Sequence, residues 1–175
     1  MRKMASIQTI RDITPIEGAD AIVLAHVNGW AAVVKLGEFS VGQHVVFCEI
    51  DSWIPHELAP FLSKGKEPRE YLGVKGERLR SAKLRGTLSQ GLILPIKVLP
   101  PADYAEGDDV SEVIGIVKYE PPVPVQLAGQ VKGNFPSLVS KTDEERVQNI
   151  RDLEKYLDEV FVETEKLHGT SVSFV

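Results

Sequence analysis

The chain has 175 residues, of which 43% are apolar and 26% charged. This composition provides enough apolar material for a core and excludes disorder over most of the length. No apolar stretch approaches the roughly 18 residues of a membrane span, and the N-terminus is too polar for a secretory h-region. We therefore expect no membrane association. A single cysteine, Cys48, excludes an internal disulfide and favours a cytoplasmic protein, and four scattered histidines predict no Cys/His zinc site.

The net charge of −5 hides one basic segment, residues 64–85. This segment has a local charge of +5 and leaves the remainder at −10. Its eight cations are Lys64, Lys66, Arg69, Lys75, Arg78, Arg80, Lys83 and Arg85. Such asymmetry can mark a polyanion-binding surface or simply a solvated loop. Gly65, Gly73 and Gly76 predict that the segment is loop-like.

Short apolar runs predict a series of β-strands over the first two thirds of the chain. The expected strands are residues 5–12, 21–27, 30–35, 45–50 and 91–95, with the first one broken at Thr14-Pro15. Consecutive apolar residues in 45–50 predict burial on both faces. A short helix or an irregular lid is expected within residues 54–62. Short strands at this spacing, with a long connection in the middle, indicate a small closed or partly closed barrel of the OB type.

Asn28-Gly29 predicts a two-residue hairpin turn in which both positions have positive φ. The neighbouring Trp30 and Phe47 lie in apolar strands, which favours a place in the core. Trp53, between Ser52 and Ile54, is the better candidate for a surface aromatic that stacks on bases. If residues 78–85 form one strand, Arg78 and Arg80 share one face.

The pattern changes after residue 117. Three prolines in 119–124 predict a stiff linker over residues 118–140. Thr142 and Glu145 then form a capping box, and apolar residues at helical spacing predict an α-helix. These residues are Val147, Ile150, Leu153, Leu157 and Val160. Residues 161–167 and 170–175 read as two strands of a hairpin that needs a further sheet, so we expect the chain to be a fragment.

Two segments fit K-x-x-G, the nucleophile pattern of enzymes that form a lysyl–nucleotide adduct: one begins at Lys83 and the other at Lys166. The pattern alone does not separate them, because neighbouring cations can activate Lys83. The context favours Lys166, which ends a strand after a capped helix and precedes a glycine that lets the backbone approach a nucleotide.

The segment Glu165-Lys166-Leu167-His168-Gly169-Thr170-Ser171 resembles motif I of ATP-dependent RNA ligases, typically E-K-x-H-G-T. Residues 118–122, 135–137 and 141–149 resemble the branch typified by the Deinococcus and Naegleria enzymes. The β-rich half is similar to their OB module, with blocks at 37–39, 49–52, 84–86 and 88–91. The resemblance covers nearly the whole chain. It implies a mainly β fold with some α: an OB barrel over 1–117, a linker over 118–140, and the first helix and hairpin of a nucleotidyltransferase (ATP-grasp-like ligase) domain over 141–175.

The resemblance implies sealing of RNA ends or nicks through a lysyl-AMP intermediate, with ATP and Mg²⁺ or Mn²⁺ as cofactors. Lys166 would be the nucleophile. The implied ATP-binding positions are Glu165, Leu167, His168, Gly169 and Arg146. Ser171 departs from the Asn found at this place in another branch, which puts a ribose contact there in doubt. Without later motifs, we expect these 175 residues to be inactive in ligation.

The implied partner is RNA or a nicked RNA-containing duplex. Its expected contacts are Lys75, Arg78, Arg80, Lys83, Arg85 and Trp53. Purely structural roles stay open for two of the implied ATP-binding residues: Arg146 could be a helix-surface residue paired with Asp143, and His168 could be a turn residue. Two other classes also stay open, a non-catalytic OB module that binds nucleic acid and a barrel that binds proteins.

Overall fold

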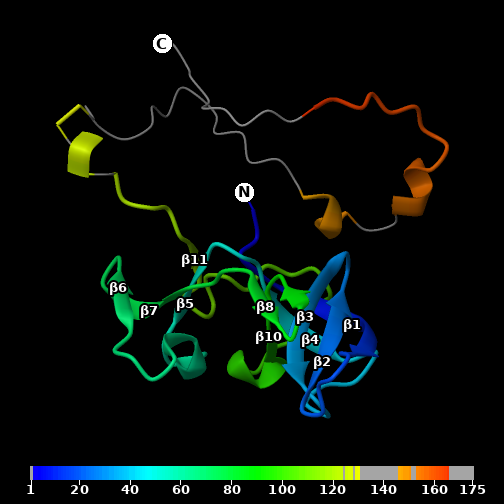
Figure 1. Cartoon of the computed structure of the whole chain (residues 1–175), viewed down its shortest axis with the longest axis horizontal. Helices are drawn as coiled ribbons and strands as arrows, with labels where there is room; N and C mark the ends of the chain where they lie inside the picture. The colour runs from blue at the N-terminus through cyan, green and yellow to red at the C-terminus, as the bar shows by residue number, and fades with distance from the viewer. Residues whose placement is uncertain (1, 124, 128, 131–145, 151–152, 166–175) are drawn as a thin grey trace.

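The computed structural model describes residues 2–123, 125–127, 129–130, 146–150 and 153–165, and its main feature is a curled antiparallel sheet (Figure 1). The five strands of this sheet are β1 (Ala5–Pro15), β2 (Ile22–Val27), β3 (Trp30–Lys35), β4 (His44–Cys48) and β10 (Leu92–Pro95). They lie in the order β10-β4-β1-β2-β3. The Gln90 N–H, just before β10, donates to the Ala31 carbonyl of β3 at 2.8 Å. The two edges of the sheet therefore approach each other, as in a small barrel.

All five predicted barrel strands are confirmed, with changed ends. β1 continues through Thr14 to Pro15 instead of breaking there, and its register with β2 shifts between Ile10 and Asp12. The Asn28–Gly29 hairpin joins β2 to β3 as predicted. The expectation of two positive φ angles is wrong, because Asn28 has φ 50° and Gly29 lies outside the left-handed region.

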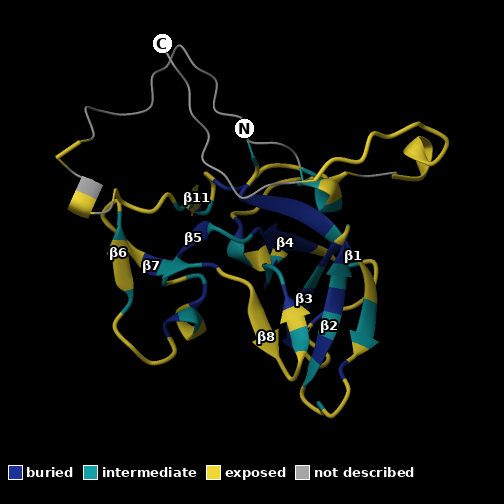
Figure 2. Ribbon diagram, turned by 45° about the horizontal axis from the view of Figure 1, so that its top comes forward, coloured by how far each residue is buried: buried dark blue, intermediate teal, exposed yellow. Residues whose placement is uncertain are grey.

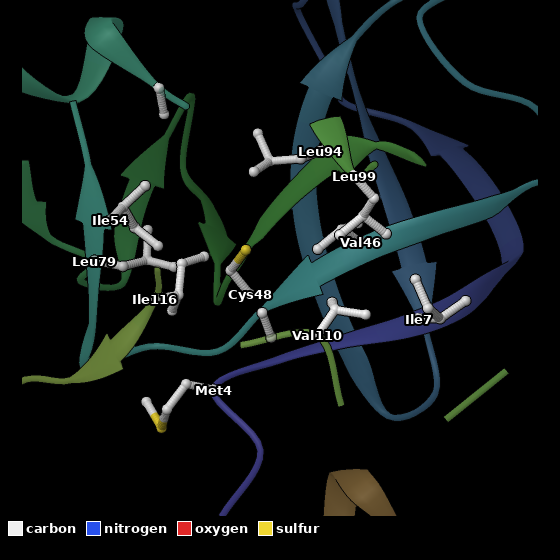
Figure 3. Packing of buried hydrophobic residues seen from close by; sticks show 12 residues of the cluster. Met4, Ile7, Val46, Cys48, Ile54, Leu79, Leu94, Leu99, Val110 and Ile116 are labelled. Carbon is white, nitrogen blue, oxygen red and sulfur yellow. The ribbon is translucent and has the colours of Figure 1, made fainter. Parts of the chain in front are cut away.

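The strand β4 separates two apolar clusters, because alternate side chains of a strand point to opposite faces. Val45 and Phe47 pack in the cluster inside the barrel, together with Trp30. Val46 and Cys48 pack on the other face with Ile7, as Figure 3 shows. The predictions that this strand is buried on both faces and that Trp30 and Phe47 belong to the core are confirmed.

The connection between β4 and β10 forms a small ribbon and three strands of a second sheet, whose fourth strand, β11 (Val117–Lys118), follows β10 in the chain. The sheet has the order β11-β5-β7-β6, and its other strands are β5 (Ser52–Pro55), β6 (Arg69–Tyr71) and β7 (Val74–Arg78). The ribbon pairs β8 (Ala82–Leu84) with β9 (Thr87–Ser89). The 3-10 turn η1 (Pro60–Ser63) fits the expected short helix.

The prediction that residues 64–85 are loop-like is therefore wrong for β6, β7 and β8, whereas residues 64–68, with Gly65, form no strand. Gly73 does not interrupt a strand but forms the turn between β6 and β7 with φ 79°, and Gly76 lies inside β7. Residues 78–85 are not one strand, because β7 ends at Arg78 and β8 begins at Ala82. A further 3-10 turn, η2 (Ile96–Val98), follows β10.

The predicted helix over residues 142–160 is not formed in its described part. Short 3-10 turns occur instead, η4 (Val147–Asn149) and η5 (Leu153–Tyr156). The side chains of the expected apolar stripe are exposed, from 37% at Ile150 to 95% at Val160. Helices in proteins owe most of their stability to a buried apolar face, which this stripe does not have here.

Residues 161–165 also differ from prediction, since they form no strand and Phe161 and Val162 are exposed. The capping box at 142–145 and the expected hairpin from Lys166 onward lie outside the described residues. Within the expected linker, η3 (Val125–Leu127) is a single 3-10 turn. A search of the described residues finds no helix long and apolar enough to cross a membrane.

Candidate nucleic-acid interface and nucleotide site

The β8–β9 ribbon carries basic residues, and its strand β8 is exposed along its whole length (Figure 2). Its turn consists of Arg85 at φ 49° and Gly86 at φ 82°. Two successive positive φ angles are those of a type I′ turn, which matches the twist of paired strands. This geometry places Arg85 at the tip of the ribbon.

Three cations predicted to bind nucleic acid lie on or beside this ribbon: Arg80, Lys83 and Arg85. All three are exposed, and residues 79–89 contain no acid. Within the described part of the chain, none of the three forms an ion pair. Their positive charge is therefore available to an external anion, and Leu84 and Leu88 add exposed apolar surface beside them.

The other two predicted cations are engaged within the protein. Arg78 donates from Nε and Nη2 to Asp51 Oδ1 at 3.0 and 2.6 Å, and its guanidinium lies 5.1 Å from the ring centroid of Tyr119. Lys75 approaches Glu67 at 3.6 Å, in an exposed pair of the kind that contributes little to stability. Among the described residues, the predicted cations therefore divide into a ribbon group without ion pairs and a group paired within the protein.

The expectation that Trp53 lies at the surface is wrong, because its exposed fraction is 2%. Its Nε1–H donates to the Val74 carbonyl at 3.1 Å, and its ring lies 5.3 Å from Tyr71 and 5.8 Å from Tyr119. These contacts fix β11 against the hairpin β6–β7, so Trp53 is part of the second sheet's packing.

Arg146 lies against the barrel and not on a helix. Its guanidinium is 5.5 Å from the ring centroid of Trp30, and its Nη2 is 3.9 Å from Asp51 Oδ2. The backbone of Arg146 is extended, with φ −75° and ψ 135°. Asp51 thus contacts two arginines, Arg78 from β7 and Arg146 from the segment that leads to Lys166. Asp143, the expected partner, lies outside the described residues.

A groove of about 650 Å³ lies beside the second sheet. Its charged lining residues are Arg2, Lys118, Asp109, Glu112 and Glu120, with apolar walls that include Tyr71 and Val117. Three carboxylates against two cations disfavour a polyanion in this groove. The charge distribution therefore favours the ribbon as the nucleic-acid contact.

The predicted nucleophile Lys166 and its neighbours Leu167, His168 and Gly169 lie outside the described residues, and Glu165 is exposed. Lys83, the other K-x-x-G lysine, lies on an exposed strand, and the glycine of its motif forms the ribbon turn. All three residues of the strand that carries Lys83 are exposed. Among the described residues no three His, Cys, Asp or Glu side chains gather to hold a metal ion.

The sequence alone predicts no role for Asp51 or Asn149. Both lie in blocks typical of the resembled family, residues 49–52 and 141–149, and this was the available signal. Their partners could not be read from the sequence, because Asn149 contacts residues about 100 positions away.

Comparisons with known proteins support the assignment of the β-rich region as an OB-type barrel. A family described as an OB-fold domain matches residues 4–96. The chain is similar to structures of a Naegleria gruberi RNA ligase, one with PPi (51% identity, TM-score 0.72) and a mutant with AMP and Mn (50%, TM-score 0.75). These matches cover 85% and 88% of this chain, which spans 44% and 46% of those chains. No curated protein matches the sequence.

Proposed function

The chain belongs to the family of OB-fold domains, and from this premise we propose that it is the amino-terminal part of an ATP-dependent RNA ligase. The observation that carries the proposal is about 50% identity to an RNA ligase over more than four fifths of the chain, together with the segment Glu165-Lys166-Leu167-His168-Gly169. One of the similar structures contains ATP and Mn, which supports ATP as the co-substrate.

In the proposed reaction the Lys166 amine attacks the α-phosphorus of ATP, forming a P–N bond and releasing pyrophosphate. The AMP then passes to the 5′-phosphate of an RNA end, which frees the lysine. A 3′-hydroxyl finally attacks that 5′-phosphorus, closes the strand and releases AMP. Each step is transfer at phosphorus, in which positioning and charge stabilisation dominate.

Residues 141–175 would begin the nucleotidyltransferase domain. By motif position, Glu165, Leu167, His168 and Gly169 would surround the nucleotide, and Arg146 would contact its phosphates from the barrel rim. Mg²⁺ or Mn²⁺ would supply further neutralisation of phosphate charge. The described residues form no ligand cluster for it, so we assign the metal to no side chain. A single cysteine also fits the reducing cytoplasm.

The ribbon would bind the RNA substrate. It lies on the connection between the fourth and fifth barrel strands, which is one of the two loops with which OB folds bind oligonucleotides. Arg80, Lys83 and Arg85 would contact phosphates, while Arg78 stays with Asp51. A nicked duplex and a single RNA strand both offer such phosphates.

Transfer of label from [α-³²P]ATP tests the proposed activity. The protein expressed from the complete reading frame that contains this chain should form a covalent lysyl-AMP adduct, and Lys166→Ala should abolish it. Lys83→Ala is the matched control, because it removes the lysine of the other K-x-x-G segment and should keep the adduct. Absence of label in the wild-type protein contradicts the ligase proposal. The 175 residues alone should label poorly.

Salt titration of RNA affinity tests the ribbon. The triple variant Arg80→Ala/Lys83→Ala/Arg85→Ala should weaken binding and lower the slope of log K against log salt by about 2–3, since each phosphate contact contributes about 0.7–0.9. The control triple Lys35→Ala/Lys66→Ala/Lys97→Ala removes equal charge from exposed positions elsewhere and should keep the slope. Equal losses from both triples would contradict a ribbon site. No salt-dependent binding by the wild type would favour a protein-binding barrel.

A further inference from the structure

Residues 146–149 are attached to the barrel beside the turn between β2 and β3. The Gly29 N–H donates to the Gln148 carbonyl at 3.0 Å, and Trp30 Nε1–H donates to Asn149 Oδ1 at 2.5 Å. Trp30 is 2% exposed, so its indole N–H has little access to water. The attachment is therefore made by polar groups at the margin of the core.

The Asn149 amide makes a second contact on its other side. Its Nδ2 donates to Glu49 Oε1 at 2.5 Å, while Glu49 Oε2 accepts from Arg2 Nε at 2.6 Å. Trp Nε1 can only donate and an ionised carboxylate can only accept, so these partners require a side chain that accepts and donates at once. Among side chains of this length, the asparagine amide meets that requirement.

Gly29 leaves the space in which this segment lies. A Cβ at position 29 would be 2.8 Å from Gln148 Cα and 3.2 Å from the Gln148 carbonyl oxygen, closer than backbone atoms tolerate. The φ of Gly29 does not lie in the left-handed region, so the turn itself does not require glycine. Close approach of residues 146–149 is the physical reason for a glycine here.

The attachment also fixes Arg146, three residues before Asn149. Its guanidinium lies beside the Trp30 ring at 5.5 Å, and Asp51 Oδ2 lies 3.9 Å from its Nη2. Trp30 therefore contacts the segment twice, through its ring at Arg146 and through its Nε1–H at Asn149. Loss of the Asn149 contacts would free the backbone that carries Arg146.

We infer that Asn149 is a positioning residue, which holds residues 146–149 on the barrel at Trp30, Glu49 and Gly29 and so fixes Arg146 at the barrel rim. The OB module thereby orients a cation for the nucleotide site in addition to binding RNA. The expected effect on catalysis rests on the proposed function, in which Arg146 contacts the phosphates of ATP. The attachment of residues 146–149 to the barrel does not depend on that function.

Indole ¹H–¹⁵N resonances of the 175-residue chain test the attachment without any enzyme activity. The chain has two tryptophans, and Asn149→Ala should shift the Trp30 indole resonance and speed its exchange with water, while Trp53, bonded to Val74, stays unchanged. Gly29→Ala should give the same shift. Gln148→Ala is the matched control, because it keeps the backbone carbonyl that Gly29 binds. A Trp30 resonance unmoved by both Asn149→Ala and Gly29→Ala would overturn the inference.

Lysyl-AMP formation by the protein from the complete reading frame tests the positioning role. Asn149→Ala should lower kcat/KM for ATP by on the order of 10- to 100-fold, the effect of a misplaced catalytic contact, and Asn149→Gln should recover part of it. Arg146→Ala should give a similar loss, and the double variant no further loss. Multiplied losses in the double variant would overturn action through Arg146. A wild type without label refutes the ligase proposal alone, because the indole shifts still decide the attachment.

Discussion

The barrel and the segment 146–165 both carry apolar residues at regular spacing, yet only the barrel buries them. Ile7 and Val45 are 0% exposed, whereas Leu157 is 78% and Val160 95% exposed. In the barrel each strand pairs with a neighbouring strand, and apolar side chains pack against both faces of the sheet. The helical stripe of 147–160 finds no apolar surface among the described residues. The spacing of apolar residues thus predicts an apolar face, but a helix or strand forms only where another part of the protein packs against that face.

The two regions also differ in what holds them. The barrel is stabilised by two apolar clusters on either side of β4, while residues 146–149 are held by hydrogen bonds to Gly29, Trp30 and Glu49. A hydrogen bond formed on folding replaces bonds to water and therefore contributes modestly to stability, whereas a buried apolar side chain contributes through the area removed from water. Substitutions in the two regions should therefore lower the free energy of unfolding by very different amounts.

The largest difference should come from truncating one apolar side chain in each region. Ile7→Ala truncates a fully buried side chain of β1 in the cluster that contains Val46 and Cys48, and it should lower the free energy of unfolding by about 2–5 kcal/mol. Val160→Ala removes a side chain that is already in water and should change it by less than about 0.5 kcal/mol. Urea unfolding followed by near-UV circular dichroism measures both. Equal losses would show that residues 146–165 pack as firmly as the barrel.

A glycine pair should give the next largest difference. A Cβ at Gly76 would lie 2.2 Å from the Ile54 carbonyl oxygen of β5, so Gly76→Ala forces β5 and β7 apart. Overpacking of this kind costs about 1–3 kcal/mol. Gly129→Ala meets nothing within 4 Å and serves as the control. Thermal unfolding of the two variants compares them, and a Gly76→Ala variant as stable as the control would contradict the close approach of these strands.

Local signals in the sequence predicted the barrel well. Residues 45–50, with successive apolar side chains, became a strand buried on both faces, and Asn28-Gly29 became a hairpin. Both results follow from local sequence: consecutive apolar residues place apolar side chains on both faces of a strand, and an Asn-Gly pair favours a tight turn. The reason given for Gly29 was wrong, because the atoms that exclude a side chain there belong to Gln148, far away in the chain.

Long-range pairing explains the predictions that failed. Gly65, Gly73 and Gly76 predict a loop over residues 64–85, although Gly73 lies in the turn between two paired strands and Gly76 lies inside one of them. Trp53 lies between polar and proline-containing neighbours, but two tyrosines from distant segments cover its ring. The sequence also could not show which cations form ion pairs. Arg78 pairs with Asp51, 27 positions away, whereas the ribbon cations form no ion pair among the described residues.

The smallest effect should be that of Gly29→Ala on the alkylation of Cys48, a buried residue of the barrel. Burial raises the pKa of this thiol to about 12 from its usual value of about 9. The thiolate is the reactive form, and it is disfavoured at every pH below about 12 in the folded state, so iodoacetamide at pH 8 should label Cys48 only when the barrel opens. Ile7→Ala, in the same cluster, should therefore speed labelling strongly.

Gly29→Ala, which should detach residues 146–149, should leave the labelling rate of Cys48 within about twofold, because a change of less than about 0.5 kcal/mol in barrel opening corresponds to roughly that factor. The reason is that the detached segment contributes hydrogen bonds at the margin and no side chain to the cluster around Cys48. Labelling is read by mass spectrometry of the intact chain. A Gly29→Ala rate close to that of Ile7→Ala would mean that the segment stabilises the barrel as a whole, and the two regions would then unfold as one unit.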